Sequence, residues 1–200
     1  MIYLIITTSI ITKYNNQNED HRRLRYINCI NQVCSIIPNE IKVIIVENNG
    51  NRSTYLDQFN NVFYTNNNNV KETHKGINEL NDIKQCIENF NIKDDDIIIK
   101  LTGRYRVLDD SFFKLILNNK EKDAFVKFYN VCTLQFCDFD CVLGLFAIKT
   151  KFIKNFNYNV NSVPEVEFAT HVKKNVNNYM EVEKLSLECC FADDLRLLYI

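Results

Sequence analysis

The sequence predicts an α/β protein in which helices flank a mostly parallel, doubly wound sheet. Short apolar runs rich in Ile and Val alternate with segments of helical periodicity, as in parallel strands joined by crossover helices. The chain has 200 residues, of which 46% are hydrophobic, with only two prolines and four glycines. Such a chain can bury one sizeable core. Since no internal repeat or linker interrupts it, we expect one domain over residues 1–200.

Four strands are expected in the first half, each a short apolar run rich in β-branched residues. They are Ile2–Thr8, Lys42–Val46, Val62–Tyr64 and Ile97–Ile99. The polar run 66–69 is expected to be a loop. The last of the four strands is central and runs into the segment Lys100 to Tyr105.

Helices between these strands are predicted from apolar residues three or four positions apart. The first ends before Pro38 and is expected to bury one face. That face contains Leu24, Ile27, Ile30 or Asn31, Cys34 and Ile37. The next helix is expected to bury Ile77, Leu80, Ile83, Ile87 and Phe90, with Asn78, Glu79, Asn81 and Lys84 elsewhere on its surface. A short helix is expected near Ser53 to Phe59.

The second half is expected to add two helices and two strands. The helices are Ser111–Leu117 and Pro164–Lys174, and the strands are Ala124–Tyr129 and Leu143–Ile148. The last stretch, through Asp193 and Leu195, is expected to strap across the surface.

Charge and hydropathy exclude several classes of partner. A formal charge of -1 and a pI near 6.3 leave no basic field for nucleic acid or an anionic membrane. The apolar start, Met1 to Thr12, lacks a basic leading segment and is too short to span a bilayer. We expect a cytoplasmic protein with a small-molecule partner, whose anionic groups are held by local cations.

The eight cysteines are interpreted as reduced thiols, because the chain is long enough to fold without staples. Cys29, Cys34 and Cys86 fall at helix-core spacings. No pair has C-x-x-C spacing and the three histidines form no cluster, so neither a zinc site nor a catalytic triad is predicted.

In an open parallel sheet, ligands bind beyond the carboxyl ends of the strands. That rule selects residues 7–9 after the first strand, Glu47 and Asn48 after the second, and Lys100 to Arg106 after the central strand. It rejects the acidic run 94–96, which precedes the central strand and lies at the other edge.

Two segments then carry a resemblance to a known family. Lys75-Gly76-Ile77-Asn78-Glu79-Leu80 and Lys100-Leu101-Thr102-Gly103-Arg104-Tyr105, in this order after the first strands, resemble GT-A glycosyltransferases of bacterial polysaccharide pathways and large DNA viruses. The resemblance implies one Rossmann-like GT-A domain of the nucleotide-diphospho-sugar transferase type. Its nucleotide-binding part is about residues 1–109, and its acceptor side about 110–200.

The resemblance also implies roles for individual residues. The nucleoside lies against the ends of the first two strands, near Thr7, Thr8, Glu47 and Asn48. Lys75, Lys100 and Arg104 oppose the diphosphate, and Asn78, Glu79, Thr102, Gly103 and Tyr105 complete the substrate site. Gly103 allows the backbone to approach the ligand. The simpler alternatives are a turn cap for Glu47 and solvated cations for Lys75 and for the arginines at 22, 23 and 25.

An inverting transfer needs a carboxylate to take the proton of the acceptor hydroxyl. Glu165 is the first candidate and Glu167 the second, at the start of the helix that begins at Pro164. Ser162 and Glu165 also have the spacing of a capping box, an alternative use for Glu165.

Many GT-A enzymes carry Asp-x-Asp after the central strand to hold a divalent ion, and this sequence has Leu-Thr-Gly-Arg-Tyr there. Asp109, Asp110, Asp138 and Asp140 lie later. We therefore favour cationic side chains in place of a metal, with Mn²⁺ or Mg²⁺ as the alternative.

The predicted function is transfer of a sugar from a nucleotide-diphosphate sugar to a glycan, a glycoprotein or another hydroxyl acceptor. A sugar nucleotidyltransferase would need an early glycine-rich phosphate loop, which glycines at 50, 76, 103 and 144 do not form. A non-catalytic nucleotide-sugar-binding module of the same fold is the second alternative.

Overall fold

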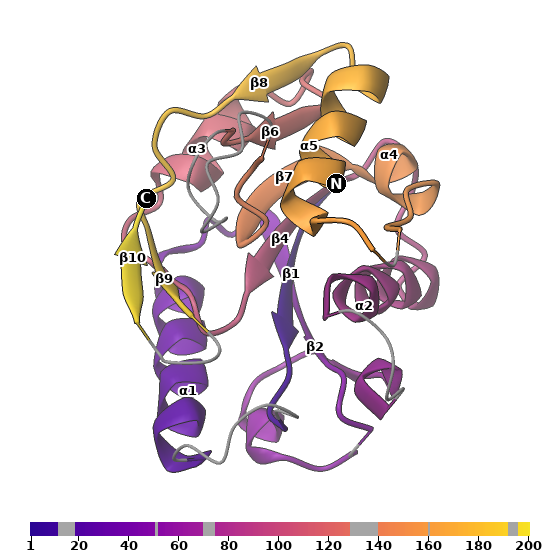
Figure 1. The fold of residues 1–200 in the computed structure, drawn as a ribbon. Coiled ribbons are helices and arrows are strands. Elements are labelled where there is room, and N and C mark those ends of the chain that lie inside the picture. The colour runs from indigo at the N-terminus through magenta and orange to yellow at the C-terminus, as the bar shows by residue number, and fades with distance from the viewer. Residues whose placement is uncertain (12–18, 51, 70–74, 129–139, 160, 192–195) are drawn as a thin grey trace.

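The computed structural model describes residues 1–11, 19–50, 52–69, 75–128, 140–159, 161–191 and 196–200 (Figure 1). Seven strands form the main sheet in the order β3-β2-β1-β4-β7-β6-β8. They are β1 (Ile2–Thr8), β2 (Ile41–Glu47), β3 (Val62–Tyr64), β4 (Ile97–Thr102), β6 (Ala124–Val126), β7 (Leu145–Lys149) and β8 (Tyr179–Glu181). Only β7 runs antiparallel to its neighbours. The predicted mostly parallel sheet is confirmed.

Helices cover both faces of this sheet (Figure 1). The α-helices are α1 (Glu19–Ile36), α2 (Lys75–Asn89), α3 (Ser111–Asn118), α4 (Thr150–Lys154) and α5 (Pro164–Asn175). Two short 3₁₀ helices, η1 (Tyr55–Gln58) and η2 (Asn67–Asn69), lie near β3 in the sequence. The expected loop at 66–69 is therefore partly helical.

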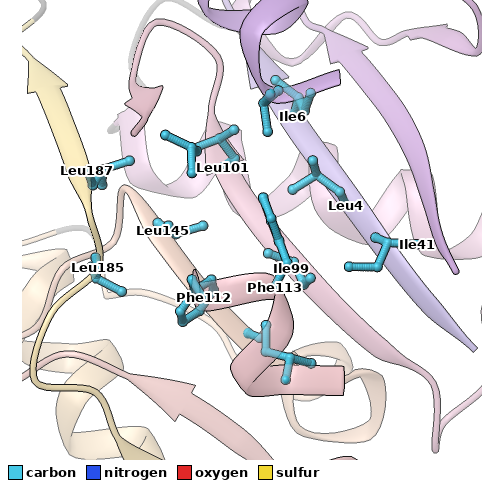
Figure 2. Close-up of a cluster of buried hydrophobic side chains, with 14 of the residues drawn as sticks. Leu4, Ile6, Ile41, Ile99, Leu101, Phe112, Phe113, Leu145, Leu185 and Leu187 are labelled. Carbon is cyan, nitrogen blue, oxygen red and sulfur yellow. The ribbon is translucent and has the colours of Figure 1, made fainter. Parts of the chain in front are cut away.

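The core has two parts, because successive side chains of a strand point to opposite faces of the sheet. Leu4, Ile6, Ile99 and Leu101 pack on one face with the aromatic pair of α3 (Figure 2). Ile5 and its counterparts on β4 and β7 pack on the other face with α2 and α5. Burial on both faces explains why these strands are continuous apolar runs.

The predicted buried face of α1 is correct for Ile30 and wrong for Leu24 and Cys34. Leu24 is 54% exposed and Cys34 is also exposed, whereas Tyr26, Cys29, Ile30 and Val33 are buried. Two overlapping apolar stripes run along this helix, and spacing alone cannot choose between them. Polar contacts hold the stripe that contains Tyr26 and Cys29 against the protein core. The Tyr26 hydroxyl lies 3.2 Å from the Ser9 amide, and the Cys29 thiol donates to the Arg104 carbonyl at 3.4 Å.

The predicted face of α2 is correct for Leu80, Ile83 and Ile87, which are buried. Phe90 lies beyond the helix and is 37% exposed. Asn78 is buried rather than on the surface, because α2 packs its first turns against the carboxyl edge of the sheet.

The expected surface strap is wrong for β9 (Leu187–Cys190), which is fully buried. β9 is the middle strand of a second, antiparallel sheet, between β5 (Arg106–Val107) and β10 (Leu197–Tyr199). Residues 192–195 lie outside the described part. The second sheet holds the segment after β4 in place.

All cysteines in the described ranges are free thiols, and Cys132 and Cys137 lie outside those ranges. Among the helices of the described residues, none is long and apolar enough to cross a membrane.

Candidate active site

The centre of the candidate site is Lys100, near the carboxyl end of β4. Its side chain is only 2% exposed. The ammonium donates to the Thr102 hydroxyl at 2.7 Å and to the Leu143 carbonyl at 2.7 Å, and pairs with the Glu79 carboxylate at 2.8 Å. An ammonium has three N–H groups, so these contacts use all of them.

This geometry argues against the phosphate role predicted for Lys100. In the structure the ammonium faces inward and has no N–H left for a phosphate oxygen. A lysine after a strand was expected to face the ligand, but three well-placed acceptors hold it inside the protein. Lys100 thus has a structural role in the site, where it orients the side chains of Glu79 and Thr102.

Glu79 links α2 to both central strands. The same carboxylate oxygen that pairs with Lys100 accepts a hydrogen bond from the Thr7 hydroxyl of β1 at 2.5 Å. The side chain is 30% exposed, so Glu79 also faces the open edge. The motif around Lys75 to Leu80 and the motif around Lys100 to Tyr105 therefore meet through one ion pair.

Glu165, on the first turn of α5, lies within electrostatic reach of this pair. Burial raises the pKa of the Glu165 carboxyl, Lys100 acts to lower it, and Asp140 and Glu79 add to the rise. A half-buried carboxylate of raised pKa is a stronger proton acceptor than an exposed carboxylate. Of the two candidates for a base, Glu165 is the one within electrostatic reach of the Lys100–Glu79 pair, and its role as a base stays a prediction.

Glu167 is instead tied to the loop before its own helix. Its carboxylate accepts hydrogen bonds from the Asn159 amide at 2.9 Å, from the Asn159 side chain, and from the Ser162 hydroxyl at 2.6 Å. The capping box predicted for Ser162 and Glu165 is wrong: the N-cap is Val163, without a side-chain cap. The Ser162 hydroxyl reaches Glu167, two residues further on.

Arg104 follows the carboxyl end of β4, and its side chain reaches β9. Its Nε donates to the Cys190 carbonyl at 2.8 Å, and its guanidinium lies 5.5 Å from the centre of the Tyr105 ring. The side chain is half-buried. Arg104 therefore has part of its fork engaged in the protein, and its phosphate contact stays a prediction.

The packing around Gly103 requires a glycine, and its predicted close approach to a ligand stays a prediction. An added Cβ would lie 2.8 Å from a methyl carbon of Thr8 and 3.1 Å from the Thr7 carbonyl oxygen. The Gly103 amide donates to that carbonyl at 2.8 Å. The glycine lets the end of β4 approach the end of β1, which fixes the edge on which the site is built.

The ends of β1 and β2, where the nucleoside was predicted to lie, contain a buried carboxylate. Glu47 is fully buried, and it accepts hydrogen bonds from the Thr8 hydroxyl, the Ile10 amide, and the amide and side chain of Asn49. Burial raises the pKa of Glu47, and these hydrogen bonds oppose the rise. Glu47 thus shapes the loop after β1; a direct contact of Glu47 with a nucleoside stays a prediction. Lys75 is exposed at the start of α2.

Sequence reasoning missed Asp82, which is buried on α2. It accepts hydrogen bonds from Asn48 at 2.8 Å, Thr65 at 2.5 Å and Asn67 at 2.6 Å. Burial raises its pKa to about 6. The signal was present as a polar stripe at 78, 79 and 82, which are neighbours on a helix. Asp82 joins α2 to the loops after β2 and β3.

The described residues do not fit a divalent ion at the end of β4. The backbone there carries Thr102 to Arg104, and no three His, Cys, Asp or Glu side chains in the described ranges come together as ligands. Asp109 and Asp110 lie by the start of α3, Asp140 is buried, and Asp138 is outside the described residues. We assign no step of the reaction to a metal.

The sequence matches no protein-family model and no curated protein. Solved structures match it by fold. S. aureus TarS 1-349 aligns over 90% of this chain and 57% of its own, with 13% identity and a TM-score of 0.54. The galactosyltransferase LgtC, in complex with donor and acceptor sugar analogues, aligns over 91% of this chain and 73% of its own, with 9% identity and a TM-score of 0.53. A197 from STIV aligns over 99% and 93%, with 12% identity and a TM-score of 0.48.

The chain therefore has the α/β fold of GT-A glycosyltransferases, as the resemblance of its two motifs implies. It spans about half to three quarters of the length of TarS and LgtC.

The packing of Gly144 against Tyr105 gives a first prediction. An added Cβ at Gly144 would lie 2.2 Å from a Tyr105 ring carbon, so Gly144→Ala displaces the ring and lowers the free energy of unfolding by about 1–3 kcal/mol. Chemical denaturation measures this change. The double variant with Tyr105→Ala should lose less than the sum of the two single variants. Additive losses would mean that the ring does not respond to position 144.

Asp82 gives a second prediction, on the pH dependence of stability. Because its folded pKa is raised, its contribution is present at low pH and is lost as the pH rises through about 6. Asp82→Asn should raise the free energy of unfolding at pH 8 by about 1–3 kcal/mol, and the gain should shrink toward pH 5. Asn48, whose Oδ1 has no partner, can turn to accept from the new amide.

The control for this second prediction is Asp95→Asn on the surface, where the side chain is 84% exposed. It should change stability little at either pH. A loss of stability in Asp82→Asn that is equal at pH 8 and pH 5 would contradict the prediction.

Proposed function

We propose that this chain transfers a sugar from a nucleotide-diphosphate sugar to a hydroxyl acceptor, with inversion at the anomeric carbon. The observation that carries the proposal is the half-buried Glu165 carboxylate beside the Lys100–Glu79 pair, at the ligand-binding edge of a sheet with the GT-A fold. In this proposal residues 1–109 bind the nucleotide and residues 110–200 supply the acceptor side, including the base.

The chemistry needs one proton acceptor and one stabiliser of the leaving group. Glu165 takes the proton of the acceptor hydroxyl as its oxygen attacks the anomeric carbon, and the bond from that carbon to the diphosphate oxygen breaks. The leaving nucleoside diphosphate gains negative charge. Because the N–H groups of Lys100 are engaged, the cations proposed to oppose this charge are Lys75, on the first turn of α2, and Arg104.

The acidic surroundings support placing the sugar, rather than the diphosphate, beside Lys100. Glu79, Asp140 and Glu165 act together there against one buried cation. Carboxylates accept hydrogen bonds from sugar hydroxyls and repel phosphate oxygens. The diphosphate therefore belongs nearer the first turn of α2 and the segment after β4.

The proposal predicts that Glu165→Gln lowers turnover by ~10²-fold or more, the usual scale of a general base. Release of nucleoside diphosphate from a donor, with a verified acceptor, measures it. Donor binding should persist, because the substitution keeps the shape of the side chain. The wild-type rate should fall as the pH is lowered, since only the ionised form of Glu165 accepts the proton, and its raised pKa should start this fall at a higher pH than for an ordinary glutamate.

The matched control is Glu167→Gln on the same helical turn. It weakens the loop contacts with Asn159 and Ser162, so it should lower the melting temperature and keep most of the turnover. Full activity of Glu165→Gln would show that the base lies elsewhere. Nucleotide-sugar binding with no turnover under any acceptor condition would favour the non-catalytic module.

A further inference from the structure

A pocket opens between α2, β4, β7 and α4, directly beside the candidate site. Leu80, Ile83, Phe146 and Ile153 form its apolar wall, and all four side chains are at most 5% exposed. Glu79 and Lys100 form its polar rim. The pocket is small, with room for a group about the size of a methyl group. Because Glu79 and Lys100 belong to both, the pocket adjoins the site proposed to hold the sugar.

The rim offers few hydrogen-bonding groups to a ligand. The three N–H groups of Lys100 are all engaged, so it has none left to donate. One Glu79 oxygen binds Thr7 and Lys100, whereas the other forms no hydrogen bond with any described residue and can accept one. Tyr158 also lines the pocket, and burial raises its pKa well above the ordinary value, so its hydroxyl stays protonated and can donate.

These features select among the substituents of a sugar. A hydroxyl pressed against the wall of Leu80 and Phe146 would lose its hydrogen bonds to water, at a cost of about 1–3 kcal/mol. A water molecule there would have Glu79 and Tyr158 as its polar partners, the lower end of the two to four that a buried water needs. An acetamido group would suit these features, with its methyl against the wall, its N–H toward Glu79 and its carbonyl toward Tyr158.

We propose that the transferred sugar carries an acetamido group, which this pocket recognises. The inference rests on the proposed function and specifies its substrate class. Ile83 and Gly76 of α2 then act as specificity-determining residues, because both line the space that the methyl group fills.

Calorimetric titration with matched donors tests the inference. The donors are N-acetylglucosamine and glucose, and N-acetylgalactosamine and galactose, each linked to UDP, dTDP, GDP and CDP. Whichever nucleotide binds, the acetamido sugar should bind about 10-fold or more tightly than the plain hexose, the scale of one apolar group in a fitted pocket. Equal or weaker binding of the acetamido sugar overturns the inference and leaves the proposed function standing. Binding of no donor overturns both.

Variants that fill the pocket sharpen the test. Gly76→Ala adds one methyl group at its wall, and Ile83→Phe adds more volume from the next turn of α2. Each should bring the ratio of the two affinities toward one. Ile87→Phe is the control, since Ile87 is 1% exposed on the same helix and does not line the pocket. It should keep the ratio. An unchanged ratio in both filling variants, with thermal melts that show folded protein, contradicts the inference.

Discussion

The buried ion pair between Lys100 and Glu79 is the interaction on which the rest of the site depends. An ammonium that is 2% exposed is stable only with full hydrogen bonding and a compensating charge, because removal from water costs several kcal/mol per ion. Glu79 supplies the charge, and Thr102 and the Leu143 carbonyl supply the remaining acceptors. The carbonyl comes from the segment just before β7, so the pair ties α2, β4 and β7 together.

The same pair fixes what the open edge offers to a ligand. The N–H groups of Lys100 are engaged inside the protein, whereas the Glu79 side chain is 30% exposed and the half-buried Glu165 of α5 lies within electrostatic reach of the pair. The ammonium of Lys100 is thus held rigidly inside the protein, and carboxylate acceptors lie at the carboxyl edge of the sheet. In the proposed reaction, preorganisation of this kind would lower the cost of orienting a sugar beside a base. Gly103 contributes by letting the ends of β1 and β4 meet.

The sheet could be predicted because Ile-rich and Val-rich runs bury both faces, and the bounds of β1 match the prediction, Ile2–Thr8. The predicted strands also indicated where the candidate site lies, because parallel strands present their carboxyl ends at one edge of the sheet. The direction of a side chain could not be predicted. The sequence around a lysine at the end of a strand is the same whether its side chain faces solvent or, as for Lys100, three acceptors inside the protein. The pairing of β5 with β9 was also hidden, because two short segments about eighty residues apart carry no local signal.

The central claim is that this edge of the sheet binds a nucleotide-diphosphate sugar. Thermal unfolding of the purified chain with UDP, GDP, CDP and dTDP sugars tests it most directly. The account predicts that at least one donor, at a hundred times its dissociation constant, stabilises the fold by ~2.7 kcal/mol. It also predicts that Lys100→Met, which leaves Glu79 unpaired, removes that stabilisation while Lys114→Met on the surface keeps it. No shift with any donor, or an equal shift in wild type and Lys100→Met, would contradict the account.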